Sequence, residues 1–302
     1  MGLDIDDHRD EGLFHDLERL TAQRMGRRQS MRWLASAGTF ALLGCGGESG
    51  SSTSSASTTT SSSSSSTSTS GTSSGSSTTT TTGSGTCIAD PTETNGPYPA
   101  DGSNTRNGTV VNVLTSSGVV RTDIRSSFGS STATAAGIYM TLTITLVDVN
   151  NSCAPLSGYA IYIWHCNATG QYSLYDLPNE NYLRGVAETD ADGKVTFTSI
   201  FPGCYAGRYP HIHFEVYRSL NTATSYANRL LVSQFAMPAA QCNTVYSGSS
   251  TYGSSSSNFA SISIANDNVF GDNTAAQIAQ QTIAMTGDLT NGFAGTVTVG
   301  LA

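Results

Sequence analysis

The segment FPGCYAGRYPHIHFEVY, residues 201–217, places a tyrosine, an arginine and two histidines close together, in a chain that has five histidines in all. His211 and His213 are separated by one residue, and alternate residues of a β-strand project from the same face. Two neighbouring imidazoles are common metal ligands. A lone HxH pair on a strand is also compatible with surface or hydrogen-bonded histidines, so the pair by itself leaves both interpretations open.

Further polar and aromatic residues favour the metal interpretation. Tyr205 and Arg208 precede the two histidines in the same segment, and a second aromatic cluster, WHCNATGQYS, contains Tyr172. Two phenolates and two imidazoles are donors that suit a hard ferric ion. A zinc hydrolase that uses the HxH pair is a weaker alternative, because tyrosine is a poor zinc ligand.

Several short segments alternate apolar and polar residues with the period of a half-buried strand. They are IYMTLTITLVDV (residues 138–149), GYAIYIWHC (158–166), KVTFTSI (194–200), HIHFEVY (211–217), RLLVSQFAM (229–237) and AGTVTVGL (294–301). Asp192-Gly193 predicts a hairpin turn, and only Thr274 to Met285 has a weak helical pattern. This pattern predicts an all-β fold, a β-sandwich with long loops and little helix.

The N-terminal region predicts export. Residues 27–32, RRQSMR, form a twin-arginine region, and the short apolar run WLASAGTFALLGC follows. We therefore expect a Tat-type signal over residues 1–45. The run ends in LLGC, which resembles a lipobox and predicts lipidation of Cys45; a plain cleavable signal with an incidental cysteine is the alternative. Met25 directly precedes the arginine pair, so either Met1 or Met25 could be the start.

Composition separates the rest of the chain into two parts. Residues 46–86 are almost wholly serine, threonine and glycine and predict a flexible linker, because such a sequence cannot bury an apolar face. Residues 87–302 are then the folded domain. With 14 basic and 22 acidic residues, the chain has a formal net charge of −8 and no basic cluster, which argues against nucleic-acid binding.

Five cysteines follow Cys45: Cys87, Cys153, Cys166, Cys204 and Cys242. They contain no C-x-x-C pair, and an exported protein favours disulfides. An odd number leaves at least one thiol unpaired. If His213 faces Gln234 on neighbouring antiparallel strands, Cys204 and Cys242 fall nearly in register and are candidates for a disulfide, unless a bulge or another pairing intervenes.

The order of these motifs resembles the intradiol ring-cleavage dioxygenases, in particular secreted single-domain relatives of catechol 1,2-dioxygenase and protocatechuate 3,4-dioxygenase. The matching motifs are PTETNGPYP (91–99), PLSGYAIYIWHCNATGQYS (155–173), TDADGKVTF (189–197), FPGCYAGRYPHIHF (201–214) and LVSQFAMP (231–238). The G-P-Y and D-G pieces are weak alone. The resemblance depends on G-x-Y and Y-x-x-R-x-x-H-x-H occurring in the right order, and it implies a prealbumin-like sandwich.

The resemblance implies a role for each candidate residue. The implied ligands of a non-haem Fe(III) are Tyr172, Tyr205, His211 and His213. Arg208 would stabilise charge on a bound catecholate, and Gln234 would be a polar group near the oxygen-binding side. Tyr205 would leave the metal and act as the base, whereas Tyr172 would stay bound. Each residue also has a purely structural alternative: strand-end packing on Trp164 for Tyr172, a loop tyrosine for Tyr205, a surface ion pair for Arg208 and a backbone cap for Gln234. His165, beside Trp164 in the same motif, is expected not to be a ligand.

The implied reaction is cleavage of a catechol-type diol by O₂, between its hydroxyl-bearing carbons, to a cis,cis-muconate-type acid. The substrate is open among catechol, hydroxyquinol, protocatechuate and larger lignin-derived catechols. The family's helical dimerisation region has no counterpart before residue 87, so we expect a monomer or weak oligomer, held to a bacterial membrane only through Cys45 and facing the periplasm or cell surface. The rival from another class is a non-catalytic surface lipoprotein that binds a partner or glycan.

Overall fold

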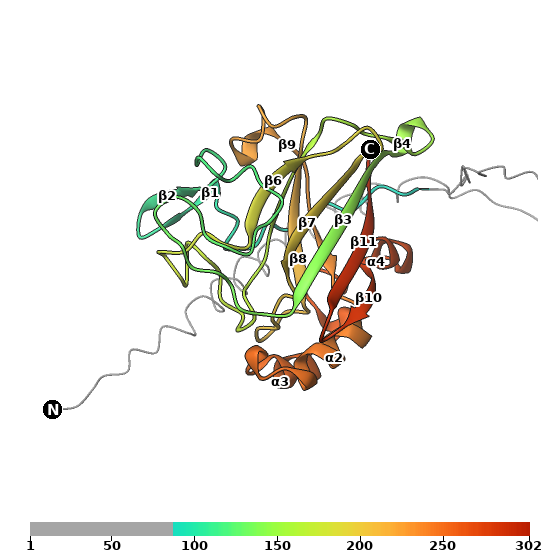
Figure 1. Cartoon of the computed structure of the whole chain (residues 1–302). Helices are drawn as coiled ribbons and strands as arrows, with labels where there is room; N and C mark the ends of the chain where they lie inside the picture. Colours follow the sequence, from blue (N-terminus) through green and yellow to red (C-terminus); the bar gives the residue numbers. More distant parts are fainter. Residues whose placement is uncertain (1–86) are drawn as a thin grey trace, which may run out of the picture. The chain divides into compact units, whose positions relative to one another are not determined.

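The computed structural model of the chain describes residues 87–302 (Figure 1). The predicted export signal (1–45), its candidate lipid attachment site Cys45 and the predicted linker (46–86) lie outside the described residues. Within the described part of the chain, no helix has the length and apolar character needed to cross a membrane.

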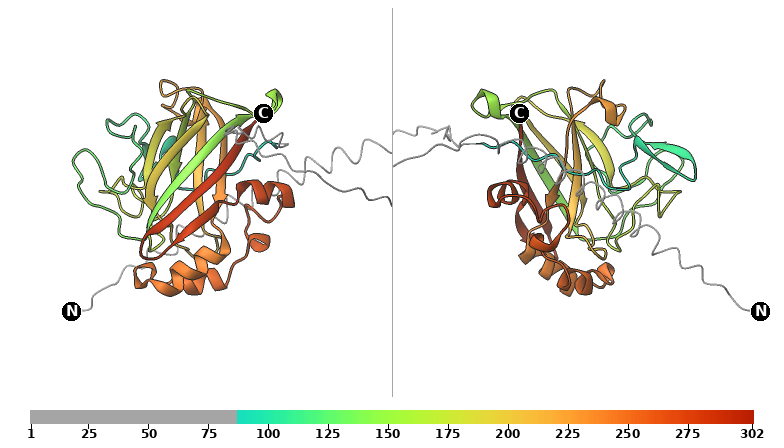
Figure 2. Two further views of the ribbon diagram at one scale, coloured as in Figure 1. Left: turned by 45° about the vertical axis from the view of Figure 1, so that its right-hand side comes forward. Right: turned by 180° about the vertical axis from the view of Figure 1, so that it is seen from behind.

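Two β-sheets form the body of the domain (Figures 1 and 2). The first sheet contains β10 (Ala284–Asp288), β11 (Gly292–Leu301), β3 (Tyr139–Asp148), β4 (Ala154–Pro155) and β7 (Lys194–Ile200). The second sheet has the order β6 (Arg184–Glu188), β5 (Ala160–Trp164), β8 (His211–Tyr217) and β9 (Arg229–Ala236). A separate hairpin consists of β1 (Asp101–Arg106) and β2 (Thr109–Asn112). Most neighbouring strands are antiparallel, whereas β11 pairs with β3 in parallel.

The core between the sheets follows from the period-two pattern of the strands. In β3 the buried Leu142 and Ile144 alternate with half-buried threonines, so one face of the strand is apolar. These side chains belong to one cluster with Ile163, Ile212 and Phe214 from the second sheet. The predicted all-β sandwich is therefore confirmed.

The second sheet is also covered on its other face. Every residue of β5 and β8 is buried, which a strand with one solvated face would not show. A second apolar cluster, including Tyr162, Trp164 and Tyr217, packs on this face. The covering segments are residues 98–128, which include the β1–β2 hairpin, and the loop around residues 166–175. Polar side chains of β8 that point away from the inter-sheet core are thus enclosed beneath these loops.

The predicted hairpin at Asp192-Gly193 is wrong in one respect. The residues do form a turn, with Gly193 at φ +71° and its N–H donating to the Asp190 carbonyl at 3.0 Å. The strands on either side, β6 and β7, lie in different sheets. The turn therefore carries the chain from one layer of the sandwich to the other, because β7 pairs with β3 and β6 with β5.

In the described part of the chain, helices are few and lie beside the sheets. Residues 274–285 were expected to be helical; α4 (Ala275–Gln281) begins there with a capping box at Thr274, but it is shorter because β10 follows. Figures 1 and 2 show α2 and α3 together at one end of the sandwich. The other helices within residues 87–302 are α2 (Ala239–Gly248), α3 (Ser255–Ala260) and the 3-10 helices η1 (Val149–Asn151), η2 (Tyr226–Asn228), η3 (Ser250–Tyr252) and η4 (Ile264–Asn266).

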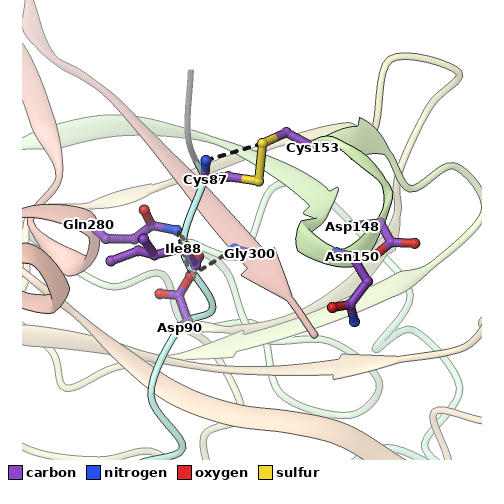
Figure 3. Close-up of a disulfide and its surroundings, with 8 residues drawn as sticks. All are labelled: Cys87, Ile88, Asp90, Asp148, Asn150, Cys153, Gln280 and Gly300. Carbon is purple, nitrogen blue, oxygen red and sulfur yellow. Dashed lines mark hydrogen bonds between the residues drawn. A yellow bond between two sulfur atoms is a disulfide. The ribbon is translucent and has the colours of Figure 1, made fainter. Parts of the chain in front are cut away.

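The segment that enters the domain at Cys87 is anchored at several points (Figure 3). A disulfide joins Cys87 to Cys153, next to β4. The Asp90 N–H donates to the Gly300 carbonyl at 2.9 Å, and the Gly300 N–H donates to the Asp90 carboxylate at 2.8 Å. Gln280 of α4 donates to the same carboxylate at 3.1 Å. These bonds fix the start of the domain against β11 and α4.

The predicted disulfide between Cys204 and Cys242 is absent. Both thiols are free and buried, as is Cys166. The strand register that suggested the disulfide is correct, because His213 does face Gln234. However, Cys204 precedes the start of β8 and Cys242 lies in α2, so neither cysteine is in the paired region to which the register applies.

Candidate functional site

Two histidines of β8 form the base of a polar cluster. His211 and His213 point to the enclosed face of the second sheet, whereas Ile212 between them packs in the inter-sheet core. Both imidazoles are buried, and their Nε2 atoms are 3.1 Å apart. The expectation that the HIH segment is a strand with both histidines on one face is confirmed.

Tyr172 brings a phenol to the same point from a distant segment. It lies in the long loop between β5 and β6, and its Oη is 3.4 Å from the Nε2 atoms of both His211 and His213. The Tyr172 N–H donates to the Asp176 carboxylate at 2.7 Å, which fixes the backbone there. The side chain is only 1% exposed, so the phenol is enclosed on all sides by protein.

Tyr205 contributes a second phenol from the loop before β8. Its Oη is 3.3 Å from the Nε2 of His211, and its ring meets that of Tyr172 edge-on, with centroids 5.9 Å apart. The side chain is half-buried. Close packing against the Tyr172 loop requires glycine at position 170: φ is +85°, and a Cβ there would lie 2.9 Å from the Cβ of Tyr205.

The imidazole rings are held by different contacts. The Nδ1 of His211 is 2.5 Å from the Tyr209 carbonyl, so Nδ1–H donates to that oxygen and the Nε2 lone pair faces the cluster. The His213 ring is instead stacked on Trp164, its cross-strand neighbour, with centroids 4.8 Å apart. It also lies against Gly96, where a Cβ would approach Cε1 to 3.2 Å.

Burial sets the protonation of these groups. Desolvation, followed by the charge of Arg208, lowers the pKa of His211. The pKa of His213 is lowered by desolvation and by His211. Both imidazoles are therefore neutral near pH 7 and offer lone pairs. Burial raises the pKa of Tyr172, and Tyr205 adds to this effect. A phenolate at this position therefore requires a nearby cation.

The donor set fits a metal ion. Four donors at about 2.0–2.1 Å from one ion would be roughly 3–3.4 Å from one another. The separations of the Tyr172 Oη from both imidazoles, of the Tyr205 Oη from His211, and of the two imidazoles from each other are 3.1–3.4 Å and fall in this range. Two phenols and two neutral imidazoles are suited to a ferric ion. Histidine, cysteine and carboxylate side chains alone do not provide such a site, since no group of three or more of them could hold a metal in residues 87–302.

Arg208 and Gln234 form a second, adjoining polar unit. Arg208 is 3% exposed; its Nη2 donates to the Gln234 Oε1 at 2.7 Å, and its Nε donates to the Asp267 carboxylate at 3.0 Å. Gln234 lies on β9 opposite His213, and its Nε2 donates to the Thr94 carbonyl at 2.9 Å. A buried cation thus lies close enough to the histidines to lower their pKa.

All six residues predicted from sequence therefore lie on the enclosed face of the second sheet or in the loops that cover it. Tyr172, Tyr205, His211 and His213 converge, and Arg208 bonds Gln234 beside them. Their roles as metal ligands and catalytic groups stay predictions. The alternative that Arg208 is merely a surface ion-pair partner is wrong in one respect: Arg208 does pair with Asp267, but both side chains are buried.

His165, expected not to be a ligand, points away from this cluster. Its Nε2 is 2.7 Å from the Ser199 hydroxyl of β7, and its Nδ1 is 2.8 Å from the Cys166 carbonyl. Burial lowers its pKa to about 4. Both ring nitrogens are occupied by protein, so this histidine joins the two sheets.

Sequence reasoning missed three residues that support the site. Asp267 carries the ion pair with Arg208, and nothing in its irregular segment marked it. Gly96 lies in the PTETNGPYP motif, where the sequence Asn-Gly-Pro was an available turn signal, and its φ is +67°. Arg184 is 1% exposed and donates to the Ser173 hydroxyl and carbonyl at 3.0 and 2.9 Å, which secures the loop beside Tyr172.

Comparisons with known proteins agree with this architecture. Residues 122–215 match a protein family described as dioxygenase. Catechol 1,2-dioxygenase 2 of Acinetobacter lwoffii is 32% identical over 91 residues, which are 22% of this chain and 33% of that protein. The match thus spans about a third of the length of this curated relative.

Solved structures show the same fold. An intradiol ring-cleavage dioxygenase from Tetranychus urticae matches with a TM-score of 0.52 and 22% identity, over 71% of this chain and 95% of that chain. The dioxygenase Tetur07g02040 matches with a TM-score of 0.51 and 22% identity, over 71% and 94% of the respective chains. The resemblance of the sequence to this group and the expected fold are therefore confirmed.

Proposed function

From the relationship of this chain to the intradiol ring-cleavage dioxygenases, in matched sequence and in fold, we propose that it cleaves a catechol-type diol with O₂. The ring opens between the two hydroxyl-bearing carbons, and both oxygen atoms enter a cis,cis-muconate-type dicarboxylic acid. The observation that carries the proposal is the convergence of two phenols and two neutral imidazoles from three separate segments. The Oη atoms of Tyr172 and Tyr205 lie 3.4 and 3.3 Å from the Nε2 of His211, and the two Nε2 atoms are 3.1 Å apart.

The cofactor in this proposal is a non-haem Fe(III) held by Tyr172, Tyr205, His211 and His213. When bound, such an ion would take up the diol as a catecholate and make its ring reactive towards O₂. The protein supplies the four donors and their orientation. The hydrogen bond from His211 to the Tyr209 carbonyl keeps the Nε2 lone pair directed at the cluster. Enclosure by the covering loops limits the access of water.

The chain's own residues then handle protons and charge. Tyr205, half-buried and in a loop, can move aside and accept a hydroxyl proton of the diol at its Oη. Arg208 places a fixed positive charge where the diol becomes an anion. Gln234, held between Arg208 and the Thr94 carbonyl, presents an amide on the same face as His213. The identity of the diol stays open among simple and larger catechols.

A visible spectrum together with metal analysis of the purified protein tests the proposal. Charge transfer from tyrosinate to iron would give a burgundy protein with about one iron per chain. A colourless protein that contains zinc would favour a hydrolase, and a colourless protein without metal would favour a non-catalytic partner-binding or glycan-binding sandwich. Either colourless result, obtained after reconstitution with ferric iron, would refute the iron site.

We also propose that the domain functions outside the cytoplasm, as a lipoprotein at the periplasmic face or cell surface of a bacterium, attached through Cys45 and the linker over residues 46–86. The support is the twin-arginine segment and the LLGC sequence. The disulfide between Cys87 and Cys153 fits an oxidising compartment. We expect a monomer or weak oligomer whose partners are the diol and O₂.

A further inference from the structure

Asp267, directly after η4, is a buried carboxylate that no part of the proposed chemistry uses. It is 0% exposed. Its Oδ2 accepts hydrogen bonds from the Nε of Arg208 at 3.0 Å and from the Tyr209 N–H at 2.7 Å. Its Oδ1 accepts from the N–H groups of Val269 at 2.8 Å and Phe270 at 3.1 Å. One carboxylate thus ties the loop after η4 to the segment that leads into β8.

These contacts keep Asp267 ionised. Burial alone would raise the pKa of its carboxyl, but the charge of Arg208 and the hydrogen bonds from Arg208 and Tyr209 outweigh burial and lower it. A buried carboxylate with this many donors is a fixed anion. It therefore provides a permanent, immobile partner for the buried guanidinium.

The first consequence concerns the direction of Arg208. An arginine side chain is long and has many rotamers, but its guanidinium is planar and its donors have fixed relative directions. Asp267 holds the Nε edge, and Gln234 accepts from Nη2 at 2.7 Å. Two contacts on different atoms of one plane fix the orientation of the whole group beside the four-donor cluster.

The second consequence concerns His211. The peptide N–H of Tyr209 donates to Asp267, and the carbonyl of the same residue accepts the Nδ1–H of His211 at 2.5 Å. Asp267 therefore fixes the backbone of the residue that orients this imidazole. The Asp267 carboxylate therefore acts on His211 through Tyr209, and on Arg208 by direct contact.

We propose that Asp267 is the positioning residue of the site: it sets the direction of the Arg208 guanidinium and, through Tyr209, the tautomer of His211. The Arg208 part rests on the proposed dioxygenase function, because it concerns binding of an anionic diol. The His211 part concerns the free protein and stands without it.

The contacts indicate which substitution is informative. Asparagine has the shape of aspartate but only one accepting oxygen, and its amide nitrogen donates. In Asp267→Asn, either orientation of the amide would place an NH₂ group against N–H donors: those of Arg208 and Tyr209, or those of Val269 and Phe270. The substitution therefore disturbs one set of contacts while it preserves volume. Asp288→Asn is the matched control, because Asp288 also accepts two backbone N–H bonds, from Thr290 and Asn291, but is exposed in the β10–β11 turn.

The test combines two measurements on wild-type protein and these variants. The first is the affinity of the iron-loaded protein for catechol in the absence of O₂, followed by the spectral change. Asp267→Asn should weaken binding by about 10- to 100-fold, as loss of an outer-shell partner commonly does, and Asp288→Asn by less than about twofold. In an Arg208→Lys background, Asp267→Asn should weaken catechol binding by less than about threefold, because its effect acts through Arg208. Equal costs in both backgrounds would overturn the Arg208 part.

The second measurement is the ¹⁵N spectrum of the imidazoles in metal-free protein. Wild-type His211 should show the Nδ1–H tautomer, and Asp267→Asn should give a mixture; an unchanged spectrum would overturn the His211 part. If wild-type protein binds neither iron nor catechol, the proposed function fails, but the tautomer measurement still tests whether Asp267 positions His211. If Asp267→Asn does not fold, Asp267→Glu keeps the charge but displaces it, and unchanged catechol affinity and His211 tautomer in that variant would reject the proposal.

Discussion

At the scale of single residues, the two candidate tyrosine ligands differ in their surroundings. Tyr172 is 1% exposed and its Oη lies between both imidazoles, at 3.4 Å from each Nε2. Tyr205 is half-buried, lies in a loop, and approaches His211 at 3.3 Å. A ligand that leaves the metal needs space to move, and the half-buried Tyr205 has more space than the enclosed Tyr172. The proposed roles, a departing base for Tyr205 and a permanent ligand for Tyr172, agree with this difference.

The roles predict different results for two phenylalanine variants. Tyr205→Phe should keep iron and bind catechol but turn over about 10²- to 10⁴-fold more slowly, because it lacks the general base. Its remaining tyrosinate band should come from Tyr172. Tyr172→Phe should instead lose iron affinity or shift the charge-transfer band even with catechol bound. Iron content, spectra with and without catechol, and turnover rates measure these effects. Full activity in Tyr205→Phe would show that the roles are wrongly assigned.

Residue types and spacing allowed part of this site to be predicted. HIH on a strand places two imidazoles on one face, since strand geometry is regular. Asp267 could not be found in this way. It acts through a loop without periodicity, and its contact with Arg208 spans 59 positions. Long-range loop contacts of this kind depend on the complete fold.

At the scale of elements, the prediction was accurate where strands pair and inaccurate beyond their ends. The bounds of β7 and β8 match the segments KVTFTSI and HIHFEVY, and the register of His213 with Gln234 is correct. The Cys204–Cys242 disulfide failed because both cysteines lie outside the paired residues. The hairpin at Asp192-Gly193 failed because local turn chemistry does not determine which sheet the next strand joins.

The segment from Cys87 to β1 predicts a pH dependence of stability. Burial raises the pKa of Asp90 from 3.8 to about 6, against the opposing hydrogen bonds of Gly300 and Gln280. Because the folded-state pKa lies above the unfolded value, the folded state binds this proton more tightly. The stabilising contribution of Asp90 to the free energy of unfolding is therefore fully present below about pH 4, and it is lost as the pH rises through about 6.

Asp90→Asn removes this titration. Relative to wild type, the variant should gain about 1–3 kcal/mol in free energy of unfolding between pH 4 and pH 7, measured by urea denaturation across that range. Asp288→Asn is the control: hydrogen bonds from Asn291 lower the pKa of the exposed Asp288, so its difference from wild type should be constant above pH 5. A constant difference for Asp90→Asn would contradict the assigned burial of this carboxyl.

At the scale of the whole molecule, the candidate site is assembled from segments far apart in the chain. The contributors are Thr94, Tyr172, the stretch from Tyr205 to His213, Gln234 and Asp267. The second sheet and the segments around it bring them together. Such a site exists only in the folded domain. Export through the Tat system, which carries folded proteins, is compatible with a metal site of this construction.

Export can be tested with a minimal change. Replacing both Arg27 and Arg28 with lysine preserves charge but removes the twin-arginine motif, so the protein should accumulate in the cytoplasm. Fractionation of cells and immunoblotting would measure this, and Cys45→Ala is the companion variant, expected to be exported without a lipid anchor. Normal export of the double lysine variant would reject the Tat assignment.

The central claim is intradiol cleavage, and analysis of the product made from catechol under ¹⁸O₂ tests it most directly. With the iron-loaded protein, we expect consumption of one O₂ per catechol and a cis,cis-muconate-type dicarboxylic acid that carries both labelled atoms. An aldehyde product of cleavage beside the diol, a product with label in only one position, or no consumption of O₂ by any of the candidate catechols would contradict the account.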